Sequence, residues 1–91
     1  MAFDGLLLGL CRDSQTLQPI PQPEDGSGAK HHTDYQPQDA AVLPNGYFLR
    51  PHAAGMFDVT VHNCPGYQDL TKQVYIQELN PTCVYFDMNA V

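Results

Sequence analysis

Basic residues are scarce in this sequence, and tryptophan is absent from it. The chain has four Lys and Arg residues against ten Asp and Glu, which gives a formal net charge of −6. Binding to a phosphate backbone requires clustered Lys and Arg that displace counterions. The basic residues here stand about twenty positions apart, at Arg12, Lys30, Arg50 and Lys72. The composition therefore predicts no nucleic-acid partner.

Long apolar runs are also missing. The opening MAFDGLLLGLC places four leucines before a cysteine, as lipoprotein leaders do, but it carries Asp4 where a leader has Lys or Arg. Gly5 and Gly9 interrupt the apolar stretch, which is far shorter than the roughly 20 residues needed to cross a bilayer. We expect no membrane partner, no signal peptide and synthesis in the cytoplasm.

Catalytic signatures are lacking as well. The sequence contains no G-x-S-x-G, no glycine-rich phosphate loop and no H-E-x-x-H. Its two serines, Ser14 and Ser27, fall in a segment predicted to be irregular, and its acidic residues are scattered singly. We therefore expect neither an enzyme nor a cofactor.

Three cysteines, at positions 11, 64 and 83, form no C-x-x-C pair, which favours reduced thiols over a disulfide framework. His62 and Cys64 are two apart, so on a strand they would face the same way and could share a metal ion with His52 or Cys83. The alternative is that these four residues have structural roles only. His31 and His32 are expected to be a solvated loop pair.

What the sequence does contain divides near residue 40. Residues 1–39 are expected to form an N-terminal arm. Within it Phe3, Leu6, Leu7 and Leu10 recur at helical spacing, which predicts a short amphipathic helix that must dock on something to be stable. The following proline- and glycine-rich stretch predicts an extended segment.

Residues 40–91 have the period of a small β domain. Short strands are expected at AAVL and YFLR, joined by a tight PNG turn, and then at MFDVTVH, LTKQVYIQEL and CVYFDM. Alternation predicts that Phe57, Val59 and Val61 share the buried face of their strand. The overall prediction is a mainly β fold, with a small antiparallel sheet, barrel or half-sandwich of about five strands.

Five tyrosines outnumber four phenylalanines, and two of them, Tyr75 and Tyr85, fall on the polar faces of their strands. Amphipathic rings in such positions favour protein contacts. We therefore expect a non-enzymatic assembly protein, of the kind that decorates a virion capsid or joins head to tail. It would dock on larger subunits, or on copies of itself, through its sheet face and through Phe3, Leu6, Leu7 and Leu10. The alternative is a small cytoplasmic metal- or ligand-binding module.

Overall fold

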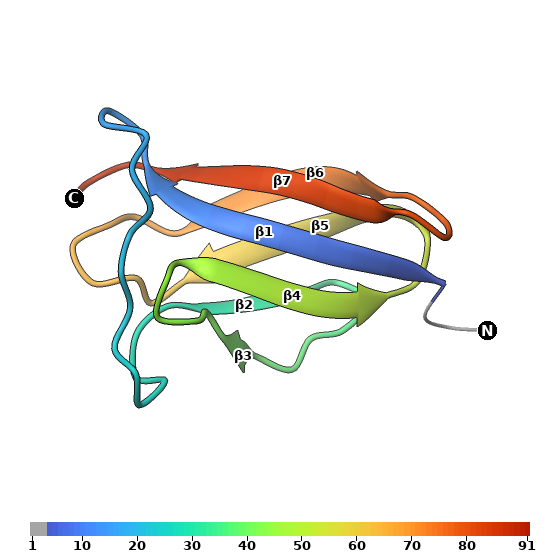
Figure 1. Cartoon of the computed structure of the whole chain (residues 1–91), viewed down its shortest axis with the longest axis horizontal. Coiled ribbons are helices and arrows are strands. Elements are labelled where there is room, and N and C mark those ends of the chain that lie inside the picture. The colour runs from blue at the N-terminus through green and yellow to red at the C-terminus, as the bar shows by residue number, and fades with distance from the viewer. Residues whose placement is uncertain (1–3) are drawn as a thin grey trace.

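The computed structural model describes residues 4–91, which fold into seven β-strands arranged in two sheets (Figure 1). Sheet A has the strand order β4-β1-β7, and sheet B has the order β3-β2-β5-β6. The strands are β1 (Gly5–Asp13), β2 (Lys30–Thr33), β3 (Ala40–Ala41), β4 (Tyr47–His52), β5 (Gly55–His62), β6 (Leu70–Ile76) and β7 (Pro81–Met88). None of the described segments forms a helix with the length and apolar content that a bilayer crossing requires.

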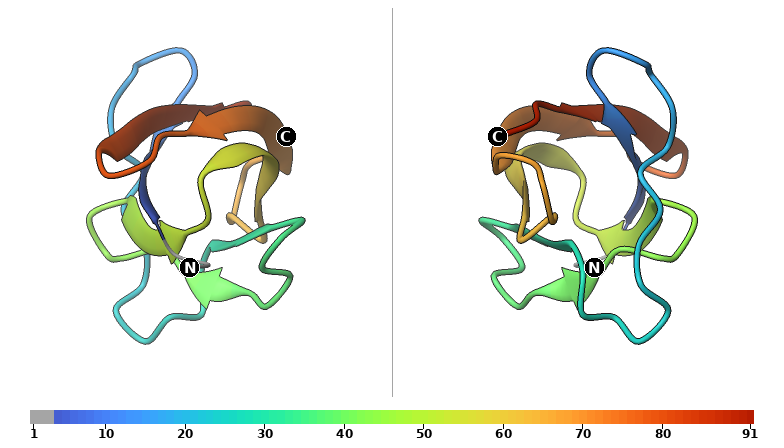
Figure 2. Two further views of the ribbon diagram at one scale, coloured as in Figure 1. Left: turned by 90° about the vertical axis from the view of Figure 1, so that its right-hand side faces the viewer. Right: turned by 90° about the vertical axis from the view of Figure 1, so that its left-hand side faces the viewer.

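The two sheets face each other across a single apolar core, as the end-on views show (Figure 2). The largest buried side chains come from both sheets and include Leu7, Phe48, Ile76 and Phe86. Sheet B is antiparallel throughout, whereas β1 pairs antiparallel with β4 and parallel with β7. The expected β class is confirmed, and the architecture is a two-layer arrangement.

The predicted N-terminal helix is wrong, because residues 5–13 form β1, the central strand of sheet A. The leucines at helical spacing also fit a strand with alternating faces. In that strand Leu7 points into the core while Leu6 and Leu10 point away from it, and Gly9 gives the ring of Phe48 room inside. Phe3 lies outside the described residues.

The expected arm is integrated into the sheets within the described part of the chain. Besides β1, it supplies β2, which pairs with β3 on one side and β5 on the other. The proline-rich stretch between them is largely irregular, but it is pinned by backbone hydrogen bonds from Ile20 to Cys11 and from Gln22 to Pro44. Residues on both sides of position 39 therefore build each sheet.

The five strands expected in residues 40–91 are all present, with the predicted faces buried. The PNG turn is present too, with the amide of Gly46 bonded to the carbonyl of Leu43. The strands that it joins do not form a hairpin ladder, however, because β3 pairs in sheet B and β4 in sheet A. The turn thus carries the chain from one layer to the other.

At each of the two open edges between the sheets, a basic side chain donates a hydrogen bond to a backbone carbonyl. Lys72 on β6 donates to the carbonyl of Tyr85 on β7 at 2.9 Å. On the opposite side Arg50 on β4 donates to the carbonyl of Gln38 at 2.8 Å. Charges placed on edge strands in this way also discourage further strand pairing.

Candidate functional site

The outer face of sheet A carries apolar side chains in rows that cross its three strands. The register aligns Tyr47, Leu10 and Tyr85 in one row. It aligns Leu49, Leu8 and Cys83 in the next row, and a third row follows with proline at both ends. We call this surface the apolar face and define it by seven residues: Leu6, Leu8, Leu10, Tyr47, Leu49, Cys83 and Tyr85.

Several of these side chains are open to solvent. Leu49 and Tyr85 are each 56% exposed and Tyr47 is 38% exposed, whereas Leu10 is 8% exposed between the two tyrosines. The two tyrosines line a hollow of about 160 Å³ together with Leu8, Gly9 and Cys83. A hollow between two tyrosines on a flat sheet can take a planar apolar group or a short segment of a partner.

The charged groups at one end of the apolar face neutralise each other. Arg12 donates to both carboxylate oxygens of Asp87, at 2.8 and 3.1 Å, and its guanidinium lies 3.8 Å from the ring centre of Tyr85. The hydrogen bonds from Arg12 lower the pKa of Asp87, which therefore stays ionised. The face is consequently apolar and has no net charge.

The residues predicted to bind a partner are divided among three places. Leu6, Leu10 and Tyr85 lie on the apolar face, whereas Leu7 is fully buried in the core. Tyr75 lies on the outer face of sheet B, opposite Met56. Sequence reasoning missed Leu8, Tyr47 and Leu49. Period-two reading of residues 5–11 would have grouped Leu8 with Leu6 and Leu10, and the same reading of residues 47–50 would have placed Tyr47 and Leu49 on one face.

The four predicted metal ligands do not come together. His52 is buried, donates from Nδ1 to the carbonyl of Ala53 at 2.9 Å, and accepts at Nε2 from the hydroxyl of Thr33 at 2.7 Å. Cys64 is buried in the core, where desolvation raises the pKa of its thiol, while Cys83 is exposed on sheet A. That set therefore gives no metal site, and His52 and Cys64 have structural surroundings.

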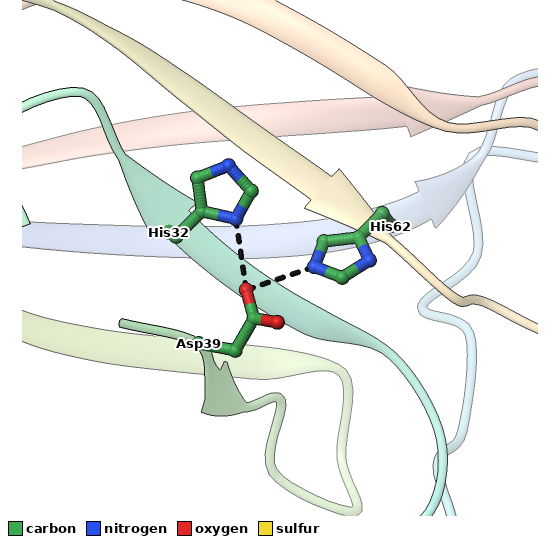
Figure 3. Close-up of side chains that lie close together, drawn as sticks. All are labelled: His32, Asp39 and His62. Atoms are coloured by element: carbon green, nitrogen blue, oxygen red, sulfur yellow. Dashed lines mark hydrogen bonds and ion pairs between the residues drawn. The ribbon is translucent and has the colours of Figure 1, made fainter. Parts of the chain in front are cut away.

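His62 instead meets two residues that the sequence did not single out together. Asp39 Oδ1 accepts hydrogen bonds from Nδ1 of His32 at 2.8 Å and from Nε2 of His62 at 2.9 Å (Figure 3). The ring centres of the two histidines are 5.3 Å apart. We call these three residues the His–Asp cluster.

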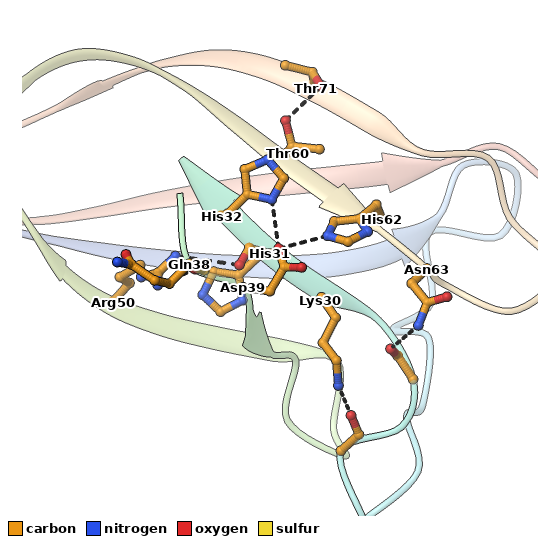
Figure 4. A network of polar contacts seen from close by, with 12 residues as sticks. Lys30, His31, His32, Gln38, Asp39, Arg50, Thr60, His62, Asn63 and Thr71 are labelled. Carbon is orange, nitrogen blue, oxygen red and sulfur yellow. Dashed lines mark hydrogen bonds and ion pairs between the residues drawn. The ribbon is translucent and has the colours of Figure 1, made fainter. Parts of the chain in front are cut away.

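Polar side chains surround the cluster on the outer face of sheet B (Figure 4). The hydroxyls of Thr60 and Thr71 are 2.9 Å apart, and Asn63 donates to the carbonyl of Gly28 at 3.1 Å. His31 does not belong to this surface, contrary to the expected solvated pair, because it points into the core and stacks on Phe48. The outer face of sheet B thus carries this polar region as well as the exposed Met56 and Tyr75, whereas the outer face of sheet A is mainly apolar.

No protein-family model matches the sequence, and no curated protein sequence is similar to it. The fold does resemble solved structures. One is described as a "putative carbohydrate binding protein" from Bacteroides uniformis, with a TM-score of 0.70 and 17% sequence identity. The match covers 93% of this chain and 41% of the other, so the present chain spans less than half of that protein. At this identity the likeness establishes a shared fold.

Proposed function

We propose that this chain is a non-enzymatic assembly protein that docks through its apolar face, and that its partner is a second copy of the chain. The observation that carries the proposal is the gathering of exposed Leu49, Tyr47 and Tyr85 on three adjacent strands. Contiguous apolar surface of this kind marks interaction sites on soluble proteins, and tyrosine is enriched at interfaces. The comparisons give no support to the narrower expectation of a virion component.

The charge distribution leaves the apolar face as the surface on which a second copy can dock. The chain carries a net charge of −6, so two copies repel each other over most of their surfaces. On the apolar face the charges of Arg12 and Asp87 are already paired within one chain. Two such faces can therefore stack about 10 Å apart, as sheets do in sandwiches, with no unpaired charge brought between them. A two-fold axis would make the contact self-complementary.

The test compares two substitutions that insert a lysine at equally exposed apolar positions. Leu49 is 56% exposed on the apolar face, and Met56 is 55% exposed on the outer face of sheet B. Light scattering after size exclusion should give a dimer for the wild type and for Met56→Lys, and a monomer for Leu49→Lys. A wild type that stays monomeric at high concentration would refute the proposal, as would a Leu49→Lys variant that remains dimeric.

A second candidate function is carbohydrate binding in the hollow between Tyr47 and Tyr85. Two observations favour it: the exposed rings that border the hollow, and the ligand class given for the structurally similar protein. Sugar rings stack on exposed aromatic side chains through their apolar faces. The candidate concerns the same surface, so the two functions need different readouts.

Affinity electrophoresis in gels that contain soluble polysaccharides distinguishes carbohydrate binding from self-association. Carbohydrate binding predicts that migration of the wild type is retarded by at least one polysaccharide, and that Tyr47→Ala abolishes the retardation. Tyr75→Ala is the matched control, because Tyr75 is exposed on the other sheet. Unchanged migration in every gel would remove the carbohydrate candidate and leave the assembly proposal unaffected.

A further inference from the structure

We propose that His32, Asp39 and His62 form a binding site for one divalent transition-metal ion, with zinc as the best-suited metal. The site lies on the outer face of sheet B, away from the apolar face, and is independent of the function proposed above. Within residues 4–91 it is the place where three potential metal ligands converge.

Strand pairing brings the ligands together from three segments that are distant in the sequence. β2 and β5 are antiparallel neighbours in which Lys30 pairs with His62 and His32 pairs with Thr60, so the two histidines are diagonal neighbours on one face. Asp39 immediately precedes β3, whose Ala40 pairs with His31 of β2. The strand pairing therefore sets the backbone positions of the three residues, and their side chains point toward one another (Figure 3).

The donor set suits a borderline metal ion. Two imidazole nitrogens and one carboxylate oxygen are common ligands of zinc and of other late first-row metals, whereas calcium and magnesium prefer oxygen ligands alone. Asp39 Oδ1 already contacts a nitrogen of each imidazole ring, so two nitrogen donors and one oxygen donor are gathered in one place.

The distances need little adjustment. The potential donor atoms all lie within 4.8 Å of one another, and the two nitrogens are 2.8 and 2.9 Å from Asp39 Oδ1. Tetrahedral zinc with bonds of about 2.0–2.1 Å places its ligand atoms about 3.3 Å apart. Small rotations of three partly exposed side chains satisfy that geometry. In each imidazole ring the proton then sits on the other ring nitrogen, so that the nitrogen facing the ion presents a lone pair.

Two basic residues lie near the cluster, and each donates to a backbone carbonyl. Lys30 is the cross-strand neighbour of His62, and its ammonium group is held by the carbonyl of Gly26 (Figure 4). Arg50 donates to the carbonyl of Gln38, next to Asp39, at 2.8 Å. The whole chain is acidic, with a net charge of −6. Three protein ligands leave a fourth position on zinc for water or for a group from a partner. The bound ion would tie the loop that ends at Asp39 to β2 and β5.

Isothermal titration of Zn²⁺ into the full chain, prepared without a histidine tag, tests the site. The titration is done in a Cys83→Ser background, because Cys83 is the exposed thiol among the described residues and thiolates bind zinc. We expect one ion per chain and a melting temperature that rises with added Zn²⁺, since the ion binds the folded state. Mg²⁺ should produce neither effect.

Three single substitutions locate the ion. Asp39→Asn and His62→Gln each remove one ligand and should weaken zinc binding by about tenfold or more. Asp58→Asn is the matched control: it neutralises an exposed acidic residue of β5 outside the cluster and should leave binding unchanged. Circular dichroism checks that each variant is folded.

Co²⁺ absorption supplies a second readout that does not rely on a melting temperature or on binding heat. Tetrahedral cobalt with nitrogen and oxygen ligands gives visible bands without the thiolate charge-transfer band. Absence of Zn²⁺ binding by the Cys83→Ser chain would overturn the proposal. So would full affinity in folded Asp39→Asn and His62→Gln, or a thiolate band in the cobalt spectrum.

Discussion

At the scale of single residues, His31 is a buried polar side chain whose surroundings oppose protonation and offer its ring no hydrogen bond. Its ring is buried and stacks on Phe48 with centres 4.1 Å apart, and neither ring nitrogen has a hydrogen-bond partner. Burial, and secondarily the charge of Arg50, lowers its pKa to about 4. His31 is therefore held neutral in the folded chain at neutral pH.

This environment predicts a loss of stability in mild acid. Below about pH 6.5 the unfolded chain binds a proton at His31 and the folded chain does not, so the free energy of unfolding falls until about pH 4. The full loss is about 3 kcal/mol for a shift of this size. Urea melts of metal-free protein at pH 7 and pH 5 should show about 2 kcal/mol of this loss, because pH 5 lies about 1.5 pH units below the unfolded pKa and still above the folded one. His31→Leu should remove most of the difference, and an equal difference in that variant would contradict the assignment.

Residue-level placement was the least predictable part from the sequence. The adjacent His31 and His32 look alike in the sequence, but they alternate on β2, so one enters the core and the other faces solvent. Asp39 offered no signal of its own, because its proximity to His32 and His62 is created by the pairing of β2 with β3 and β5. Contacts of this kind depend on strand register, which local patterns do not encode.

At the scale of elements, β1 depends on a glycine at one inward position. A Cβ atom built at Gly9 would overlap the ring of Phe48, which is buried and packs against Phe86. Gly9→Ala should therefore destabilise the chain by about 1–3 kcal/mol, as overpacking of a filled core does. Leu8→Ala is the control, since Leu8 points outward and its truncation leaves the core intact. Denaturant melts in which Gly9→Ala matches the wild type would show that the ring of Phe48 has room to move.

Strands that alternate apolar and polar residues were predictable, whereas β1 and the short polar strand β2 were not. Asp58, Thr60 and His62 alternate with apolar residues, so β5 and its faces follow from period-two reasoning. β1 reads GLLLGLC and is apolar on both faces because its outer side belongs to the exposed surface of sheet A. Its leucines matched a helical stripe equally well. The apolar outer side of β1 is the reason that the strand was mistaken for a helix, and it is also part of the apolar face on which the proposed function rests.

At the scale of the whole molecule, the proposed docking surface and the proposed metal site lie on opposite outer faces. The apolar face belongs to sheet A, the His–Asp cluster belongs to sheet B, and the core lies between them. A zinc ion on one side and a second copy on the other would therefore not compete. The sequence predicted docking through a sheet face without specifying which one. The proposal places it on sheet A because the topology sets three leucine positions of β1 between two tyrosine-bearing strands.

The charge of the molecule predicts how salt changes self-association. Each copy carries a net charge of −6, while the apolar face contributes no unpaired charge to the contact. Added salt screens the repulsion between the copies and leaves apolar burial in place, so the dimer dissociation constant should fall a few-fold as ionic strength rises. Sedimentation at low and high NaCl measures this change. A dimer held by ion pairs would weaken with salt instead, and that result would place the contact on a charged surface rather than on sheet A.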